Sequence, residues 1–273
     1  MMLMNKIRLI ALDIDGTLMQ HDGVIPDENK EAVRQCLKND IAVYLVTGRP
    51  YSFARMIADR IDQDVRVVAA NGGIYECGDA CIEQPIDQAS LTFLITQADK
   101  YGISLFLKGK HDYYANVPYD VRFLYDEQNK YFRKDLQVRS FTDLSSQQLN
   151  EQAHDILKIL TFHEDPSVMK QYRQLVEGSD LVTVTDYRPI SFDITAKGVD
   201  KGSVLKTICK NLHIDQNEVL ACGDANNDQA MFASAGWRVA MSNASVDIQK
   251  QCQIVVDNQD GKGVARAIKQ YVI

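Results

Sequence analysis

The sequence predicts an α/β protein in which a Rossmann-like, doubly wound parallel sheet forms the core and an α+β cap domain is inserted into it. Three observations lead to this prediction. Near-continuous runs of Ile, Val and Leu alternate with segments of helical spacing at the start of the chain, the alternation returns after Gly198, and the stretch between has a different pattern. With 273 residues, the chain is long enough for two domains.

The first part of the core is predicted to follow the order β-α-β-α-β. Its strands are apolar at nearly every position, as in strands that are buried on both faces of a parallel sheet. Pro26 and Pro50 stand where helices begin, because proline is favoured in the first turn of a helix. The predicted strands are 7–12, 41–46 and 65–70, and the predicted helices are 27–38 and 50–61.

The second part of the core continues this alternation to the end of the given sequence. Right-handed crossovers between its strands would place helices on both faces of one sheet. The predicted helices are 201–212, 228–235, 246–251 and one after Gly261, and the predicted strands are 219–222, 238–240 and 254–256.

The inserted segment has shorter strands with polar and apolar residues in alternation. We expect residues 1–84 and 190–273 to form the core and residues 85–189 to form the cap, which is long enough for a hydrophobic core of its own. The predicted cap strands are 104–107, 113–116, 156–162 and two that flank 186–189, and the predicted helices are 148–154 and 167–175.

Charge and composition exclude several classes of protein. A net charge of −7 and a pI near 5.3 argue against a nucleic-acid partner, so an anionic ligand would have to be held by local cations. No apolar run approaches the ~18 residues that a membrane span needs. Asp13 and Asp15 interrupt the apolar start of the chain, which argues against an export signal. We therefore expect a cytoplasmic protein, either a monomer or a homodimer.

The cysteines and histidines give no signature of a metal site or a disulfide framework. The six cysteines are scattered along the chain, so reduced thiols are expected. Cys77 and Cys81 have no second pair and no nearby histidine, which leaves zinc as a minor alternative. The five histidines lack the spacing of metal ligands.

Polar residues follow four of the predicted core strands or begin the next helix. In open parallel sheets, ligands bind beyond the carboxyl ends of the strands, so we expect these residues to meet in one cleft. They are Asp13-Ile14-Asp15-Gly16-Thr17, Thr47-Gly48-Arg49, Lys201-Gly202 and Gly223-Asp224 with Asn227-Asp228.

These residue types suit phosphoryl transfer. An Asp carboxylate such as Asp13 can attack phosphorus and form an aspartyl-phosphate, and Asp15 can give and take protons beside it. Because paired carboxylates repel a phosphate, a hard cation such as Mg²⁺ is required, and Asp224 is the distant acid for that role.

The remaining residues of the four segments would hold the phosphate and support the metal. Thr47 and the Gly48 amide can donate to phosphoryl oxygens, and Lys201 adds a positive charge at a helix N-terminus. Asn227 can orient Lys201 or the phosphate, and Asp228 can belong to the metal shell.

Together these segments resemble the four motifs of the haloacid dehalogenase superfamily, and Asn71-Gly72-Gly73 with the large insert resembles its Cof-like phosphatase branch. The resemblance implies a Mg²⁺-dependent phosphatase of small phosphorylated metabolites with a mobile cap. It implies the following roles: Asp13 as nucleophile; Asp15 as acid/base; Mg²⁺ held by Asp13, the Asp15 backbone carbonyl and Asp224; phosphate held by the Ile14 main chain, Thr47, Gly48, Lys201 and Asn227; and Asn71 in the same cleft. Arg49 is a further candidate to bind the phosphate, and Asp228 to bind the metal. Gly73, where relatives often have Ala, is a small departure from the pattern.

Alternative interpretations remain for parts of this pattern. Each segment alone could be a turn, a connection or a solvated lysine, but four accidents at strand ends in this order are improbable. Residues 224–228 look like half of a calcium loop, yet Gln229 and Ala235 occupy the positions of its glycine and glutamate. A phosphomutase and a metabolite-binding regulator with an idle site stay open as functions. Asp193 and Arg188 are candidates to reach the cleft from the cap.

Basic and aromatic residues of the insert are ambiguous in the same way. They could clamp a substrate, although positions on strand faces and on the surface of the small domain are the commoner fate of such residues. They are Lys108, His111, Tyr113, Tyr114, Tyr119, Arg122 and Tyr125.

Overall fold

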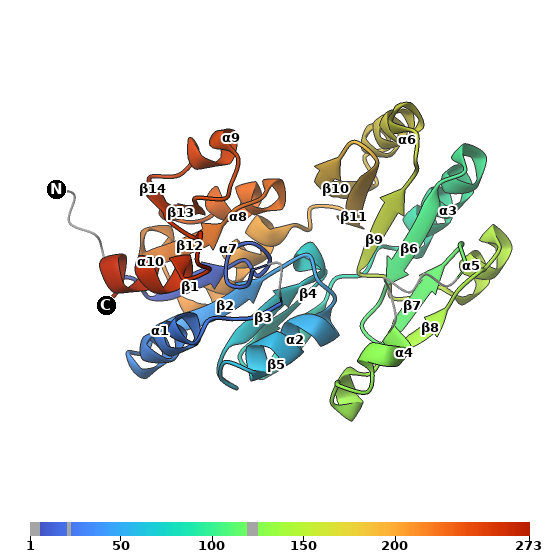
Figure 1. Ribbon diagram of the computed structural model, residues 1–273. Helices are drawn as coiled ribbons and strands as arrows, with labels where there is room; N and C mark the ends of the chain where they lie inside the picture. Colours follow the sequence, from blue (N-terminus) through green and yellow to red (C-terminus); the bar gives the residue numbers. More distant parts are fainter. Residues whose placement is uncertain (1–5, 21–22, 119–124) are drawn as a thin grey trace.

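The computed structural model describes residues 6–20, 23–118 and 125–273, without the side chains of Asp126 and Asp186. Its strands form two separate sheets, and each sheet organises one of two lobes that lie side by side (Figure 1). We call them the core lobe and the cap lobe. The core lobe contains β1 (Leu9–Leu12), α1 (Asp27–Lys38), β2 (Ala42–Val46), α2 (Tyr51–Asp59), β3 (Arg66–Ala69), β4 (Ile74–Cys77), β5 (Ala80–Glu83), α7 (Lys201–Leu212), β12 (Val219–Gly223), α8 (Gln229–Phe232), β13 (Trp237–Met241), α9 (Val246–Gln249), β14 (Ile254–Val256) and α10 (Gly263–Tyr271).

The core sheet has eight strands in the order β14-β13-β12-β1-β2-β3-β4-β5. The six strands from β14 to β3 run parallel, and β4 and β5 add an antiparallel edge. The chain winds outward from β1 in one direction with β2 and β3 and in the other with β12 to β14. The topological switch point, where ligands of such sheets bind, therefore lies at the end of β1.

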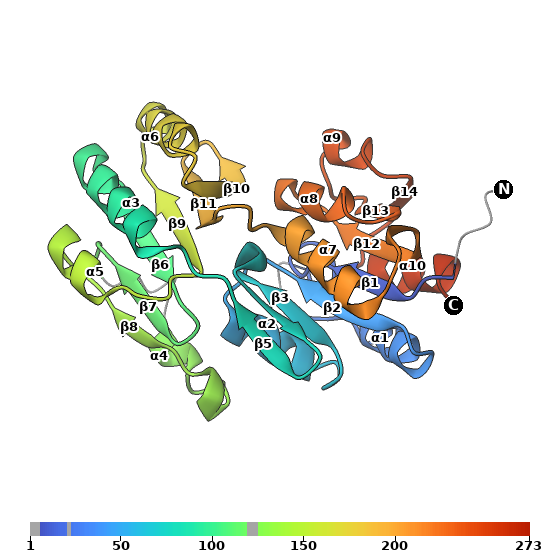
Figure 2. The same ribbon diagram turned by 180° about the vertical axis from the view of Figure 1, so that it is seen from behind.

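Helices cover both faces of the core sheet, as Figure 2 shows from behind. One hydrophobic cluster joins the sheet to α1, α2 and α10, and a second joins its other face to α7, α8 and α9. β1 contributes to both clusters because successive side chains of a strand point to opposite faces: Ile10 belongs to the first and Leu9 to the second. The predicted doubly wound α/β core is confirmed.

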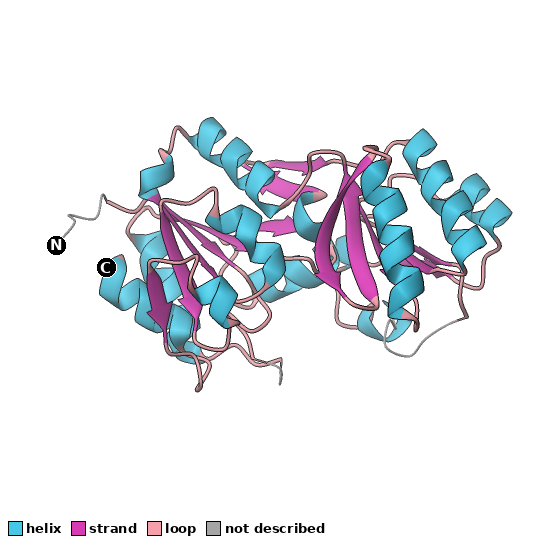
Figure 3. Cartoon of the chain, turned by 90° about the horizontal axis from the view of Figure 1, so that it is seen from above, coloured by secondary structure: helices cyan, strands magenta, loops and turns pink. Residues whose placement is uncertain are grey.

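The cap lobe is an α+β unit, as predicted. Its sheet has six strands in the order β10-β11-β9-β6-β7-β8, and a third hydrophobic cluster packs α3, α5 and α6 against one face (Figure 3). The lobe contains α3 (Gln88–Tyr101), β6 (Ser104–Lys108), β7 (Asp112–Ala115), α4 (Tyr125–Gln128), β8 (Arg139–Phe141), α5 (Ser146–Gln152), β9 (Lys158–Phe162), α6 (Pro166–Gly178), β10 (Val182–Arg188) and β11 (Ser191–Ala196).

The sheet to which β11 belongs indicates where the cap ends in the sequence. The sequence boundary put the return to the core at residue 190, but β11 pairs with β9 and β10 of the cap sheet. We therefore propose that the cap extends to Ala196 and that the chain re-enters the core before Lys201. A further difference is that α3, β4, β5 and β8 were not expected, and that α8 ends at Phe232, before the predicted end of that helix.

The two lobes also touch away from their connecting segments. Phe53 of α2 lies in an aromatic cluster of the cap, with its ring centroid 4.9 Å from that of Phe132 and 5.7 Å from that of Tyr125. Arg133 of the cap reaches Asp59 at the end of α2, 2.8 Å away. This contact places an apolar interface immediately after the Thr47-Gly48-Arg49 segment.

Candidate active site

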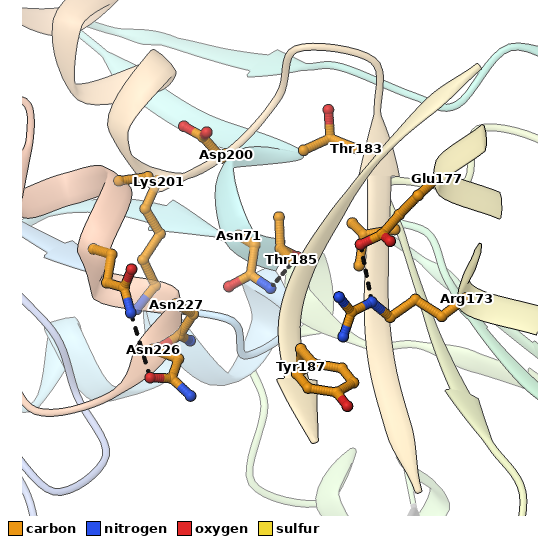
Figure 4. A pocket seen from close by; sticks show the side chains of 13 residues that line it. Asn71, Arg173, Glu177, Thr183, Thr185, Tyr187, Asp200, Lys201, Asn226 and Asn227 are labelled. Carbon is orange, nitrogen blue, oxygen red and sulfur yellow. Dashed lines mark hydrogen bonds and ion pairs between the residues drawn. The ribbon is translucent and has the colours of Figure 1, made fainter. Parts of the chain in front are cut away.

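A cleft of about 430 Å³ lies between the lobes at the carboxyl ends of the core strands. Lys201, Asn226 and Asn227 line it from the core, and residues of α6 and β10 line it from the cap (Figure 4). Asn71 lies at the base of the wall between them. The cleft thus sits at the switch point of the sheet, where the sequence predicts the site.

Lys201 is buried between two carboxylates. It is 1% exposed, and its Nζ donates to Asp13 Oδ1 and to Asp228 Oδ1, each at 2.7 Å. Burial alone would lower the pKa of Lys201, but the attraction of both carboxylates outweighs it and raises the pKa. Burial and the charge of Asp228 raise the pKa of Asp13 well above its usual value, although Lys201 acts in the opposite direction.

Asp228 holds the loop that carries Asp224. Its Oδ2 accepts from the backbone amides of Asp224 at 2.9 Å and Ala225 at 3.0 Å, while its Oδ1 accepts from Lys201. Position 223 requires glycine, because a Cβ there would lie only 2.6 Å from the Asp228 carboxylate. Asp228 therefore ties the end of β12 to the N-terminus of α7.

The Asp224 carboxylate is aimed by two neutral side chains. Thr17 Oγ1 donates to its Oδ1 at 2.9 Å, and Asn243 Nδ2 donates to its Oδ2 at 3.0 Å. Burial and the nearby charge of Asp228 raise the pKa of Asp224 to about 6. The carboxylate is thus held in place but is costly to ionise unless a cation compensates its charge.

The turn after β1 requires glycine. Gly16 has φ +81°, and a Cβ on it would collide with Asp224 Oδ2. Its carbonyl accepts from Asn243 at 3.0 Å and from Asn258 at 2.9 Å. Asn243 and Asn258, which follow the ends of β13 and β14, were not found from the sequence; an asparagine after a strand is too common to be a signal by itself.

Asp15 pairs with Arg49 rather than with Lys201. The Arg49 Nε donates to Asp15 Oδ2 at 2.7 Å and its Nη2 donates to Oδ1 at 2.6 Å, a two-pronged ion pair. The Asp15 side chain is 52% exposed, whereas Asp13 is buried. The two carboxylates of this motif therefore have different surroundings: that of Asp13 is buried, and that of Asp15 is accessible to solvent.

Thr47 and Asn71 are buried next to each other, with Gly48 beside them. Thr47 Oγ1 accepts from the Arg49 amide at 3.1 Å, and the Thr47 carbonyl accepts from the Asn71 amide at 3.0 Å. A Cβ on Gly48 would lie 2.8 Å from Asn71 Oδ1. Asn71 has φ +52°, and its Nδ2 donates to Thr185 and Asp193 of the cap, each at 3.0 Å.

The donor set at the end of β1 fits a hard divalent cation. Within the part of the chain that the structure describes, Asp13, Asp224 and Asp228 each offer a carboxylate oxygen, and these oxygens lie within 4.8 Å of one another. Oxygen ligands of this kind suit Mg²⁺. Asp13 and Asp224 keep lone pairs for such an ion, whereas both Asp228 oxygens already accept from protein donors.

Comparison with known families decides which protein class this geometry belongs to. The family model of the haloacid dehalogenase-like hydrolases matches residues 10–268, which includes every segment of the cleft. The chain belongs to this family. The predicted haloacid dehalogenase-type phosphatase of the Cof-like branch is confirmed.

Relatives of the family match this hydrolase along nearly its whole length. The 5-amino-6-(5-phospho-D-ribitylamino)uracil phosphatase YcsE of Bacillus subtilis is 26% identical over 268 residues, covering 98% of this chain and 96% of the relative. A phosphoglycolate phosphatase of Methanopyrus kandleri is 25% identical, covering 96% of each chain. The solved structure of a haloacid dehalogenase-like hydrolase from B. subtilis superposes with a TM-score of 0.83 at 26% identity, covering 97% of this chain and all of that one (100%).

The structure of this hydrolase brings most of the predicted site residues together. Asp13, Lys201 and Asp228 are in direct contact, and Asp15 contacts Arg49. Asn227 lines the cleft, but Asp13 and Asp228, rather than Asn227, accept from Lys201. The Ile14 side chain is buried in the core beneath the cleft, so only its main chain is available to a ligand.

Of the cap residues that the sequence suggests for substrate contact, some lie near the site and others pack elsewhere. Asp193 accepts from Asn71, and Arg188 lines a smaller cavity beside Asp224. Tyr113, Tyr114 and Tyr125 pack in hydrophobic clusters of the cap rather than around the cleft, while Tyr119 and Arg122 lie outside the described residues. Within the described residues, no helix is long and apolar enough to cross a membrane.

Gly73 also acquires a structural explanation. A Cβ on Gly73 would lie 2.5 Å from the Leu157 carbonyl, at the start of the cap strand β9. The core loop therefore packs directly on cap backbone at this point. A member of the family with alanine here needs a slightly different separation of these two segments.

Proposed function

We propose that this phosphatase hydrolyses small phosphorylated metabolites in a Mg²⁺-dependent reaction with an aspartyl-phosphate intermediate. The observation that supports it most is the contact of Asp13 at the end of β1 with Lys201, opposite Asp224. This arrangement combines a carboxylate nucleophile, a buried cation and a second carboxylate around one point.

The metal would be held by Asp13, the Asp15 backbone carbonyl and Asp224, with Asp228 as support. When bound, Mg²⁺ neutralises the carboxylates and the phosphoryl oxygens, so that Asp13 can remain ionised at neutral pH. Thr17 and Asn243 already hold Asp224 from the side, as expected of groups that orient a metal ligand.

In the first chemical step, an Asp13 oxygen bonds to phosphorus while the bond from phosphorus to the leaving oxygen breaks, and Asp15 gives that oxygen a proton. In the second step, Asp15 takes a proton from water, the water oxygen bonds to phosphorus, and the bond to Asp13 breaks. Lys201, Thr47, the Gly48 amide and Asn227 would stabilise the negative charge on the phosphoryl oxygens in both steps.

Arg49 fits a role in positioning Asp15. In this structure it holds the Asp15 carboxylate in a two-pronged ion pair. For proton transfer, Asp15 has to reach the leaving oxygen, so this ion pair must loosen or shift when a substrate is bound. The hydrogen bond from Arg49 to Asp15 and the charges of Asp15 and Asp13 raise the pKa of Arg49, so Arg49 is also near enough to Asp13 to add a positive charge beside the phosphate.

The proposed substrate class follows from the relatives and the size of the cleft. The named relatives act on a phosphoribityl-aminouracil and on phosphoglycolate, both small phosphomonoesters. A cleft of about 430 Å³ is at the lower end of the range for small-molecule sites. We propose a phosphorylated metabolite of this size as the substrate, with the cap residues selecting the leaving group.

The test is a panel of phosphorylated metabolites assayed for phosphate release, with Mg²⁺ and with a chelator. Asp13→Asn should lose activity by about 10³-fold or more, because it removes the nucleophile. Asp15→Asn should also abolish turnover while it leaves Mg²⁺ affinity largely intact. Full activity of the Asp13 variant would falsify the nucleophile assignment.

The same assay separates the alternatives. A phosphomutase would need a bisphosphate activator and would release no inorganic phosphate. A regulator with an idle site would bind metabolites without turnover in Mg²⁺. Each proposed catalytic position, including Asp13, Asp15 and Asp224, has the side chain that hydrolysis needs, which supports a phosphatase over both.

A further inference from the structure

The cap wall of the cleft is built by two elements that lie opposite Lys201. Helix α6 supplies Arg173 and Glu177, and strand β10 supplies Thr183, Thr185 and Tyr187 (Figure 4). A phosphoryl group at Asp13 would lie on the core side of this cleft. The rest of the substrate would therefore extend toward the side chains of α6 and β10.

Arg173 is held in a fixed orientation within this wall. Its Nε donates to Glu177 Oε1 at 2.9 Å, one helical turn away, and its guanidinium carbon lies 3.7 Å from the centre of the Tyr187 ring. Its side chain is 29% exposed. Two contacts of different kinds thus fix a side chain that is otherwise very flexible.

The orientation leaves donors available to a ligand. Figure 4 shows the guanidinium of Arg173 beside Glu177 and the Tyr187 ring, and Arg173 is one of the residues that line the cleft. Among the described residues, none accepts a hydrogen bond from its Nη1 or Nη2. A pre-oriented pair of N–H groups that faces a substrate cleft is a recognition element rather than a surface charge.

Glu177 cancels the charge of Arg173 but keeps its own capacity to accept hydrogen bonds. A hydroxyl on the substrate can accept from Arg173 and donate to Glu177, and Thr183 and Thr185 can add further hydrogen bonds. A second negative charge at this place would gain from Arg173 but would be repelled by Glu177 and by Asp200, which also lines the cleft.

We propose that the Arg173–Glu177 pair is the specificity-determining element of the cap, and that it selects leaving groups with uncharged hydrogen-bonding groups over leaving groups with a second negative charge. The proposal rests on the proposed phosphatase function and adds the residues that discriminate between substrates. The discrimination is electrostatic, so removing the negative charge of Glu177 should shift it toward leaving groups with a second negative charge.

The experiment compares sorbitol 6-phosphate with 6-phosphogluconate, which differ only in a hydroxymethyl or a carboxylate at the end remote from phosphorus. The wild-type enzyme should have a higher kcat/KM for sorbitol 6-phosphate. Glu177→Gln should shift the ratio of the two kcat/KM values toward 6-phosphogluconate by about fivefold to tenfold, because the repelling charge is gone. Arg173→Gln should raise KM for both esters by about tenfold with a smaller change in kcat.

Arg139→Gln is the matched control. Arg139 pairs with Asp112 on the cap surface, 2.6 Å away, and does not line the cleft. This variant removes an equal charge from the same lobe and should leave both KM values unchanged.

The outcome also distinguishes this proposal from the proposed function. If wild-type enzyme releases no phosphate from either ester, the dissociation constants of both esters are measured by calorimetry on the Asp13→Asn variant, with and without Glu177→Gln. Equal affinity for the two esters, or a ratio that Glu177→Gln does not change in either assay, overturns the selection by this pair even if the enzyme is an active phosphatase.

Discussion

Each lobe has a buried cluster of lysine and aspartate side chains. The core cluster has one lysine and two aspartates, whereas the cap cluster has two lysines and one aspartate. In the core, one lysine, Lys201, lies between Asp13 and Asp228. In the cap, Lys158 and Lys108 face each other on neighbouring strands, and Lys158 Nζ donates to Asp193 at 2.5 Å. Burial and the charge of Lys158 lower the pKa of Lys108 to about 7, although Asp193 acts against this.

The difference shows how each lobe uses buried charge. The core cluster has an excess of negative charge, which suits the Mg²⁺ ion that we propose for the catalytic site. The cap cluster has an excess of positive charge. Its carboxylate, Asp193, also accepts from Asn71, so the cap cluster anchors the cap to the loop at the cleft.

Removing the core lysine should have the largest effect. Lys201→Met leaves Asp13 and Asp228 buried without a cation, so we expect the free energy of unfolding to fall by about 5 kcal/mol and phosphate release to be lost. Urea denaturation measures the first and the phosphate assay the second. Lys206→Met, on the exposed side of the same helix, should change neither. Equal stability of the two variants would show that the core cluster does not need its cation.

Removing the carboxylate of the cap cluster should have a smaller effect. Asp193→Asn keeps the size and an acceptor for Asn71 but removes the carboxylate that buried Lys158 contacts, and we expect a loss of about 3 kcal/mol in urea denaturation. The control is Asp180→Asn, which breaks the exposed pair with Lys197 and should cost less than about 0.5 kcal/mol. If both changes cost the same, the burial of the cap cluster contributes nothing to stability.

Lys108 gives the cap cluster a pH dependence. Because its pKa is lowered to about 7 in the folded protein from an ordinary value of 10.5, the unfolded chain binds more protons at pH 7 to 10, and stability should rise with pH in this window. From pH 7 to pH 9 this contribution is about 2 kcal/mol.

Lys108→Met tests it by difference. The variant should lose this rise and should be more stable than wild type at pH 7, with the two curves converging toward pH 10. Subtracting the two curves removes the titration of the cysteines, which is common to both proteins. Parallel stability curves would show that Lys108 is charged equally in both states.

The core half of the site could be predicted because its residues obey one rule of topology. Asp13, Thr47 and Asp224 each follow a parallel strand, and parallel strands bring their carboxyl ends to one edge. Their partners could not be predicted. Asn243 and Asn258 follow the same rule, but a single asparagine after a strand carries no distinguishing chemistry.

The cap shows where this rule stops. Its strands are largely antiparallel, so strand ends do not gather at one edge, and Arg173 and Glu177 look like an ordinary surface pair on a helix. Helix α3 was not predicted, although Leu91, Leu94, Ile95 and Ala98 have helical spacing and pack in the cap core. Sequence therefore predicts the chemistry of this enzyme better than its selectivity.

The smallest expected effect is on Mg²⁺ affinity, because there is no space for a Cβ between Gly16 and the Asp224 carboxylate. Gly16→Ala adds a Cβ that collides with the Asp224 carboxylate, so we expect Mg²⁺ affinity in calorimetry to fall by about tenfold, or about 1.4 kcal/mol. Gly78→Ala is the matched control, because Gly78 also has a positive φ, +59°, but nothing within 4 Å of its Cβ position. Both variants carry the backbone strain of about 1–2 kcal/mol, and only the first should weaken the metal site. The same metal affinity in both would mean that the Asp224 carboxylate can move aside, and that the core cluster is less rigid than its hydrogen bonds from Thr17 and Asn243 indicate.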